Sequence, residues 1–390
     1  MRITPRLPLL LGFLTAIGPA STDMYLPAFP AIEAGLHAPA GAAQYTLAAW
    51  FAGLAIGQIT LGTLADRFGR RRPLIVASAL YTATCAACAL SPSILALSGW
   101  RVLAAIAASA GMVIPRAMVR DLADGHAAAA MLSRLMLVMG AAPILAPTLG
   151  GAVLIFANWR WIFWIMTAYG AISFVLVVAL LPETLAPAGR TTLGFSGQVA
   201  RYAAILRERG FFTHAAMGAA GIFAFFAYLA GSSPVFIDGF GLSPTAYGAL
   251  FGLCAAGLIA MAQLNARLLP RFGHGTILRW ASRAYLAAAV VLAAVAFAGI
   301  HVLAAVLAPV FVMVSLQGIL NPNTTVGALS RHAAHAGSAS ALMGTGQFLM
   351  GAISGLLVGV FTDGTPRGMA ALMLTGALAL AIADRVRGRA

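Results

Sequence analysis

The chain has 390 residues, of which 61% are hydrophobic and only 9% are charged, and its mean hydropathy is +0.92. This composition excludes a soluble globular domain and indicates an integral membrane protein. The formal net charge of +14 does not indicate a nucleic-acid partner, because the arginines lie in short loops between apolar segments.

Apolar segments of membrane-spanning length recur along the whole chain. A helix needs about 20 residues to cross the hydrocarbon core of a bilayer. The first segment has no small-residue cleavage site before Asp23, so we interpret it as a retained helix. The segments predict twelve transmembrane helices, near residues 7–28, 42–65, 73–91, 96–118, 129–156, 161–181, 213–235, 244–267, 277–299, 302–326, 337–361 and 366–383.

The longest polar interval divides these spans into two sets of six. It predicts an all-α membrane protein with an N-terminal six-helix bundle over 1–185, a cytoplasmic linker over 186–212 and a C-terminal six-helix bundle over 213–390. Arg67-Phe68-Gly69 recurs as Arg271-Phe272-Gly273 in the equivalent loop of the second half. We therefore expect two related bundles about a pseudo-twofold axis.

The arginines predict the topology. Of the 24 basic residues, all of them arginine, only Arg101, Arg160 and Arg367 fall on one side of the predicted spans, and the others fall on the opposite side. Loops rich in positive charge stay in the cytoplasm. We expect a multi-pass membrane protein with both termini in the cytoplasm.

The loop between the second and third spans is the most informative stretch. From Gly62 to Leu74 it reads Gly-Thr-Leu-Ala-Asp-Arg-Phe-Gly-Arg-Arg-Arg-Pro-Leu. Gly62 predicts a close approach of two backbones, and Gly69 predicts a turn that other residues do not readily adopt. Asp66 is a lone carboxylate beside four arginines and needs a specific partner. The alternative is a basic loop that only sets the topology.

This stretch resembles the signature G-x-L-a-D-r-x-G-r-[rk] between helices 2 and 3 of the major facilitator superfamily of secondary transporters. The resemblance implies that Asp66, Arg70 and Asp121 form a charge relay that latches the two halves in the outward-facing state. The alternative is helix capping and loop electrostatics. The residues that we assign to this latch are Gly62, Asp66, Arg67, Gly69, Arg70 and Asp121.

Asp23 is the only acidic residue that we place within the spans of the first half. A charge in hydrocarbon is costly and is tolerated mainly where it faces a cavity or a partner. Because burial favours the protonated form of a carboxyl group, we identify Asp23 as the leading proton carrier. The alternative is an aspartate at a helix end in contact with headgroup water.

Arg101 begins the fourth span on the side nearly empty of arginine. A guanidinium there stays charged and needs a carboxylate or a polar pore. It resembles the helix-4 arginine of the drug:proton antiporters, which implies a role in proton coupling, although Ala104 and Ala107 depart from the family pattern. The alternative is an interfacial anchor for the helix.

The fifth span combines two prolines with glycines, which predicts a kinked and closely packed helix. It resembles the helix-5 motif of the antiporter subgroup, with Ala146 in place of a glycine. The alternative is a purely structural kink. The motif positions are Gly140, Pro143, Pro147, Gly150 and Gly151.

Nearly the whole chain resembles the bicyclomycin-resistance (Bcr/CflA) branch of the drug:proton antiporters. Aromatic and methionine side chains make an adaptable apolar pocket to which a few polar groups add contacts. The alternative for each aromatic residue is packing or contact with lipid. Our substrate-binding candidates are Tyr25, Phe226, Tyr228, Met343 and Gln347.

The sequence thus predicts a proton-coupled exporter of small, mostly apolar drugs that works by alternating access. It predicts no enzyme activity, no cofactor and no metal, since it has neither a clustered catalytic set nor a nucleotide-binding loop. A monomer suffices, because one chain holds both halves. The main alternative is a proton-coupled exporter of a metabolite such as an amino acid or a sugar; a membrane-embedded enzyme and a channel are less favoured.

Overall fold

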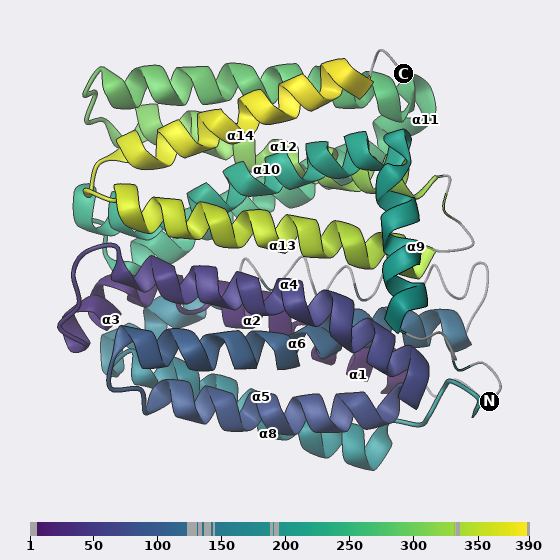
Figure 1. Cartoon of the computed structure of the whole chain (residues 1–390). Coiled ribbons are helices and arrows are strands. Elements are labelled where there is room, and N and C mark those ends of the chain that lie inside the picture. Colours follow the sequence, from purple (N-terminus) through teal and green to yellow (C-terminus); the bar gives the residue numbers. More distant parts are fainter. Residues whose placement is uncertain are drawn as a thin grey trace.

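The computed structural model describes residues 6–122, 145–187, 195–330 and 336–387, together with single residues 131, 135, 142, 190 and 332. These described residues form helices and connecting turns, with no strand among them (Figure 1). The prediction of an all-helical membrane fold is confirmed.

The helices of the first half begin with a broken span. Pro19, Pro27 and Pro30 each lack a backbone donor, so the chain from residue 6 to residue 35 forms three short helices and a 3₁₀ turn. The elements are α1 (Arg6–Thr15), α2 (Ile17–Asp23), η1 (Leu26–Ala28), α3 (Phe29–Gly35), α4 (Ala42–Phe68), α5 (Arg71–Ala89), α6 (Ile94–Leu122), an unlabelled helix over Leu145–Phe156, and α8 (Arg160–Leu180).

The second half begins with a helix that the polar interval did not lead us to expect. The elements are α9 (Phe195–Arg207), α10 (Arg209–Ser233), η3 (Pro234–Gly239), α11 (Pro244–Phe297), α12 (Leu303–Leu329), α13 (Ala336–Phe361) and α14 (Pro366–Arg387). At 54 residues, α11 is far longer than the ~20 residues that cross a bilayer. Its backbone is non-helical at Gly273, with φ of 69°, so it contains two spans joined at a kink.

Ten helical segments of the described chain are long and apolar enough to cross a membrane. Because α11 supplies two spans and the helix over Leu145–Phe156 supplies part of another, these segments account for the twelve predicted spans. Apolar side chains such as Val76 and Phe156 are 68% and 89% exposed on the outer surface, as expected for a surface that faces lipid.

The two halves lie side by side and meet along α4 and α13 (Figure 1). Helix α9 runs across the ends of the other helices, on the same side of the molecule as both chain ends. A continuous buried core includes side chains of both halves, among them Phe51 of α4 and Phe226 of α10.

The halves are in backbone contact at the end remote from the termini. A Cβ added to Gly41 would lie 2.4 Å from the carbonyl oxygen of Gly359, and one added to Gly151 would lie 2.7 Å from that of Pro244. At the other end, a polar cavity of about 250 Å³ separates α4 and α6 from α13. The interior of the protein is therefore closed at the end remote from the termini.

Candidate transport site

A cavity of about 210 Å³ lies at the centre of the molecule between the two halves. Helices α2, α4 and α6 line it from the first half, and α10, α11, α12 and α13 line it from the second. Most of the lining is apolar, with aromatic side chains from four helices. These are Phe51, Phe225, Phe226, Tyr228, Phe251 and Phe348.

Among the described residues, Asp23 is the only charged residue in the wall of this cavity. It is the last residue of α2, at the point where the first span is broken, and it is 5% exposed. Among the described residues no side chain or backbone group forms a hydrogen bond or an ion pair with its carboxylate. Asp23 is therefore buried in the protein interior and does not match the alternative of a helix end in headgroup water.

Three aromatic rings stack across the boundary between the halves. The ring of Phe51 in α4 lies 3.9 Å from the ring of Phe226 in α10, at an angle of 12° between their planes. Phe348 in α13 lies nearly parallel to both, with its ring centroid 6.3 Å from Phe51 and 6.4 Å from Phe226. This stack forms one wall of the cavity.

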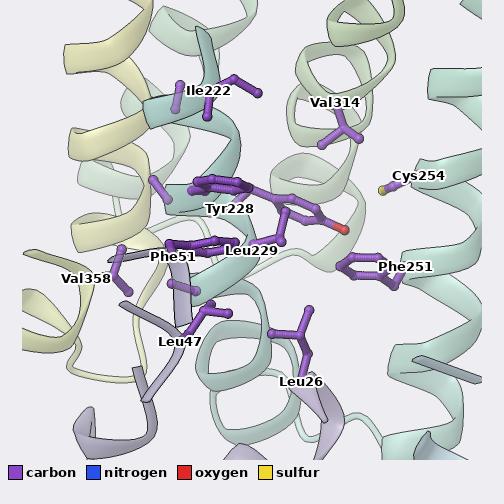
Figure 2. Close-up of a cluster of buried hydrophobic side chains, with 14 of the residues drawn as sticks. Leu26, Leu47, Phe51, Ile222, Tyr228, Leu229, Phe251, Cys254, Val314 and Val358 are labelled. Carbon is purple, nitrogen blue, oxygen red and sulfur yellow. The ribbon is translucent and has the colours of Figure 1, made fainter. Parts of the chain in front are cut away.

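Tyr228 supplies a polar group to the opposite wall. Its ring stacks on Phe251 at 5.7 Å, and Figure 2 shows its hydroxyl directed toward Cys254 and Phe251. The hydroxyl is buried and has no hydrogen-bond partner within the described part of the chain. A substrate with a hydrogen-bonding group would find this hydroxyl available.

Arg101 lies beside the cavity, in an aromatic cage. It is 1% exposed, and its guanidinium stacks on the rings of Tyr25 and Trp50 at 4.1 and 4.3 Å. One guanidinium nitrogen donates to the carbonyl oxygen of Ser21, 3.0 Å away and two residues before Asp23. The alternative of an interfacial anchor does not fit this burial, because an anchor keeps its charged end in water.

The other substrate candidates lie outside the lining of the cavity. Tyr25 belongs to the Arg101 cage, and its hydroxyl lies 3.4 Å from the hydroxyl of Thr46. Met343 packs in a separate cluster near α9. The Gln347 side chain donates to the Asn321 side chain at 3.4 Å. Of the five candidates, the structure therefore places only Phe226 and Tyr228 in the cavity wall.

The predicted charge cluster is assembled at the end near the termini. The Arg70 guanidinium donates to Asp66 at 2.5 Å and to Asp121 at 2.8 Å. Burial alone would lower the pKa of Arg70, but the hydrogen bonds and charges of Asp121 and Asp66 outweigh it and raise this pKa. All three residues belong to the first half. Asp66 and Arg70 line the polar cavity, which separates them from α13 of the second half.

Glu183 is a member of this cluster that the sequence reasoning missed. Its carboxylate accepts hydrogen bonds from the backbone N–H groups of Arg70 and Arg71, at 2.8 and 3.3 Å. Burial tends to raise the pKa of Glu183, but the donors on Arg70, Leu185 and Arg71 and the charge of Arg190 lower it below its ordinary value. Glu183 therefore ties the end of α8 to the start of α5.

The glycines of the loop have different roles from one another. Gly69 has φ of +92°, which confirms the predicted turn. The expected close backbone approach at Gly62 is wrong, because a Cβ there would lie 3.5 Å from Val113, an ordinary contact. Gly62 instead lines the polar cavity. The Arg67 guanidinium contacts the ring of Phe68 and has no carboxylate partner among the described residues.

The helix-5 motif is described in part. Gly140 and Pro143 lie outside the described residues. Pro147 and Gly150 are buried, and a Cβ on Gly150 would overlap the carbonyl oxygen of Met24. Together with Gly151, these positions bring the helix against α11 and the first span, so close packing at this end of the motif is confirmed.

Comparison with known proteins assigns the family. The model of the Major Facilitator Superfamily matches residues 11–355. The chain belongs to the major facilitator superfamily. It is 35% identical to the protein named "Uncharacterized MFS-type transporter YdgK" of Bacillus subtilis (strain 168), over 95% of this chain and 92% of that protein.

Within the superfamily, the chain is similar to relatives that are named for drug resistance. It is 27% identical to a "Bicyclomycin resistance protein homolog" of Haemophilus influenzae, over 90% of this chain and 88% of that protein. Its fold matches the crystal structure of a D-xylose–proton symporter with a TM-score of 0.74, 15% identity and 96% coverage of each chain. The protein is a multi-pass membrane transporter and not an enzyme, and the described residues hold no cluster of metal-ligating side chains.

Proposed function

We propose that this superfamily member exports small, mostly apolar drugs across the bacterial inner membrane in exchange for protons. The observation that supports this most directly is Asp23, a buried carboxyl group in the wall of an aromatic cavity between the halves, for which the described part of the chain supplies no partner. An ionised carboxylate in such surroundings is costly unless a cation or a proton compensates it. Asp23 therefore favours a bound proton whenever the cavity is empty.

Competition between proton and substrate at this cavity couples the entry of protons to the export of the substrate. A proton that arrives from outside neutralises Asp23 and favours the inward-facing state. A substrate that enters from the cytoplasm packs its apolar part against Phe51, Phe226 and Phe348, and a cationic or hydrogen-bond-donating group that it places beside Asp23 promotes release of the proton to the cytoplasm. The charged protein then returns outward with its substrate, since each ligand shifts the equilibrium by its differential affinity for the two states.

The remaining residues support this cycle in our proposal. Arg101 holds a fixed positive charge at the backbone carbonyl of Ser21, two residues before Asp23, and changes the proton affinity of the Asp23 carboxyl group. The cluster of Asp66, Arg70 and Asp121, with Gly62, Arg67 and Gly69, acts as the latch of the outward-facing state. The bundles over 1–185 and 213–390 are the moving units, and the segment over 186–212 joins them.

The proposed topology places both termini, α9 and the Asp66 cluster in the cytoplasm. The cavity is built by one chain, so we propose that a monomer carries out transport. The state described here is closed on the outer side, where Gly41 meets Gly359 and Gly151 meets Pro244.

The test is proton release on substrate binding by purified protein in weakly buffered detergent, with a panel of antibiotics and dyes that includes bicyclomycin. The wild type is compared with Asp23→Asn and with the control Asp238→Asn, since Asp238 lies outside the cavity wall. We expect release from the wild type and the control, and binding without release from Asp23→Asn. Equal release from all three proteins would overturn the role of Asp23.

Substrate class is tested separately in proteoliposomes. Uphill accumulation of an intact drug that stops when the proton gradient is collapsed supports drug:proton antiport. Accumulation of an amino acid or a sugar in the same assay, with no drug bound, would favour the metabolite exporter instead.

A further inference from the structure

A groove on the outer surface of the first half is built separately from the transport cavity. Its walls are α4 and α5, and its floor is α6, with Ile106 at the bottom. Leu61, Leu64 and Phe68 line it from α4, and Val76 and Leu80 line it from α5. We call this surface the α4–α5 groove; its volume is about 370 Å³.

The groove is apolar along its length and open to the outside. Leu64, Phe68 and Leu80 are 41%, 46% and 41% exposed, and Val76 is 68% exposed. Along α5 the lining runs from Arg72 to Leu80, which at 1.5 Å per residue is about 12 Å. This length suits the upper part of one lipid acyl chain in the hydrocarbon of one leaflet.

Arg72 lies at one end of the groove and Arg67 lies beside Phe68 of its wall, and neither guanidinium has an ion-pair or hydrogen-bond partner among the described residues. Of the arginines in this loop, Arg70 is bound by Asp66 and Asp121, and Arg71 donates to the carbonyl oxygen of Val178 at 2.7 Å. Arg67 and Arg72 have no carboxylate or carbonyl partner in the described part of the chain. Arg72 itself lines the groove, and Arg67 stacks on Phe68, which also lines it.

An apolar groove with Arg67 and Arg72 near one end matches the chemistry of an anionic phospholipid. The acyl chain gains apolar contact, and the guanidinium groups bind a phosphate and an anionic headgroup well. Anionic lipids are attracted to basic residues at the membrane surface. A neutral lipid would satisfy the apolar walls but not the two charges.

We propose that the α4–α5 groove binds one anionic phospholipid, with its phosphate between Arg67 and Arg72 and one acyl chain along Val76 and Leu80. This lipid would bridge the end of α4 and the start of α5, on either side of the Gly69 turn. The proposal does not depend on the role of Asp23.

The test is native mass spectrometry of the full-length protein with dioleoyl phosphatidylglycerol or dioleoyl phosphatidylcholine. We expect preferential retention of phosphatidylglycerol by the wild type. Arg67→Gln and Arg72→Gln should each lower its affinity about fivefold. Val76→Trp fills the groove and should lower retention without a change in charge. The matched control is Arg207→Gln, an exposed arginine on α9.

The arms of this test separate a lipid site from a general effect of charge. Equal retention of the two lipids, or the same loss in Arg207→Gln as in Arg72→Gln, would overturn the proposal. So would retention that Val76→Trp leaves unchanged, or displacement of the lipid by glycerophosphoglycerol, which has the headgroup and no acyl chains. Each variant is first checked for a monodisperse elution profile, and Val76→Leu replaces the tryptophan variant if that one aggregates.

Discussion

The backbone contact between Gly151 and Pro244 predicts how the outer closure responds to a single methyl group. In Gly151→Ala the new Cβ would lie 2.7 Å from the carbonyl oxygen and 3.0 Å from the carbonyl carbon of Pro244, so one helix must move. Overpacking of this kind costs about 1–3 kcal/mol. Alanine favours a helix over glycine, so the cost arises at the contact between the halves.

This cost applies only to the state that is closed on the outer side. It therefore shifts the ratio of outward-open to outward-closed protein by about 5–150-fold. Cys254 reports the shift, because it lines the transport cavity and is 1% exposed in the closed state. We expect a membrane-impermeant maleimide, added outside intact cells, to label Cys254 faster in Gly151→Ala by up to this factor.

Two controls make the labelling experiment decisive. Cys85 and Cys88 are buried elsewhere in the first half and are replaced by alanine, which leaves one thiol. Gly99→Ala is the matched variant, because a Cβ at Gly99 would meet no atom within 4 Å. An unchanged labelling rate in a folded Gly151→Ala protein, or an equal rise in Gly99→Ala, would refute the reasoning.

Three further predictions concern the cavity and the charge cluster. Phe226→Ala removes a ring of the cavity wall that stacks 3.9 Å from Phe51. The loss of aromatic contacts worth about 0.5–1.5 kcal/mol should weaken drug binding about 2- to 13-fold in an equilibrium titration. The control Phe297→Ala, at an exposed position, should leave the affinity for the drug unchanged. Asp121→Asn should lower the unfolding temperature more than Asp66→Asn, because the Asp121 side chain is 15% exposed and that of Asp66 is 53% exposed. The reverse order of unfolding temperatures would contradict the assignment of the Arg70–Asp121 ion pair as the more buried of the two. Because the pKa of Glu183 is lowered by folding, its stabilising contribution is present above its ordinary value of 4.5 and is lost as the pH falls through the lower folded value. As the pH falls through this acidic range, the unfolding temperature of the wild type should thus fall more steeply than that of Glu183→Gln. Parallel plots of unfolding temperature against pH for the two proteins would argue against a stabilising role of ionised Glu183.

The sequence was sufficient to predict the helical class, the spans and the cluster around Arg70. Each of these rests on a local signal: apolar length for the spans, and one loop signature for Asp66 and Arg70. The polar interval concealed α9, because its composition resembles that of a loop. A signal was present in the three-residue spacing of Tyr202 and Ile205, of which Tyr202 lines the polar cavity and Ile205 is buried.

The composition of the cavity wall was harder to predict. Phe51 and Phe348 lie in spans that carry many apolar residues, and nothing in their local sequence distinguishes an inward-facing ring from one that faces lipid. Tyr25 was chosen because it is close to Asp23 in sequence, yet the helix break between them turns its ring toward Arg101. Packing between helices, rather than a motif, decides which rings meet.

The stack of Phe51, Phe226 and Phe348 has a mechanical consequence. A pair of stacked rings contributes only about 0.5–1.5 kcal/mol beyond the area that it buries, and offset arrangements of the two rings are favourable. Two of these rings belong to the second half, and Phe51 belongs to the first. In the proposed alternating-access motion the rings would slide past one another, so the cavity wall would change shape while Phe51 keeps an aromatic contact with the second half.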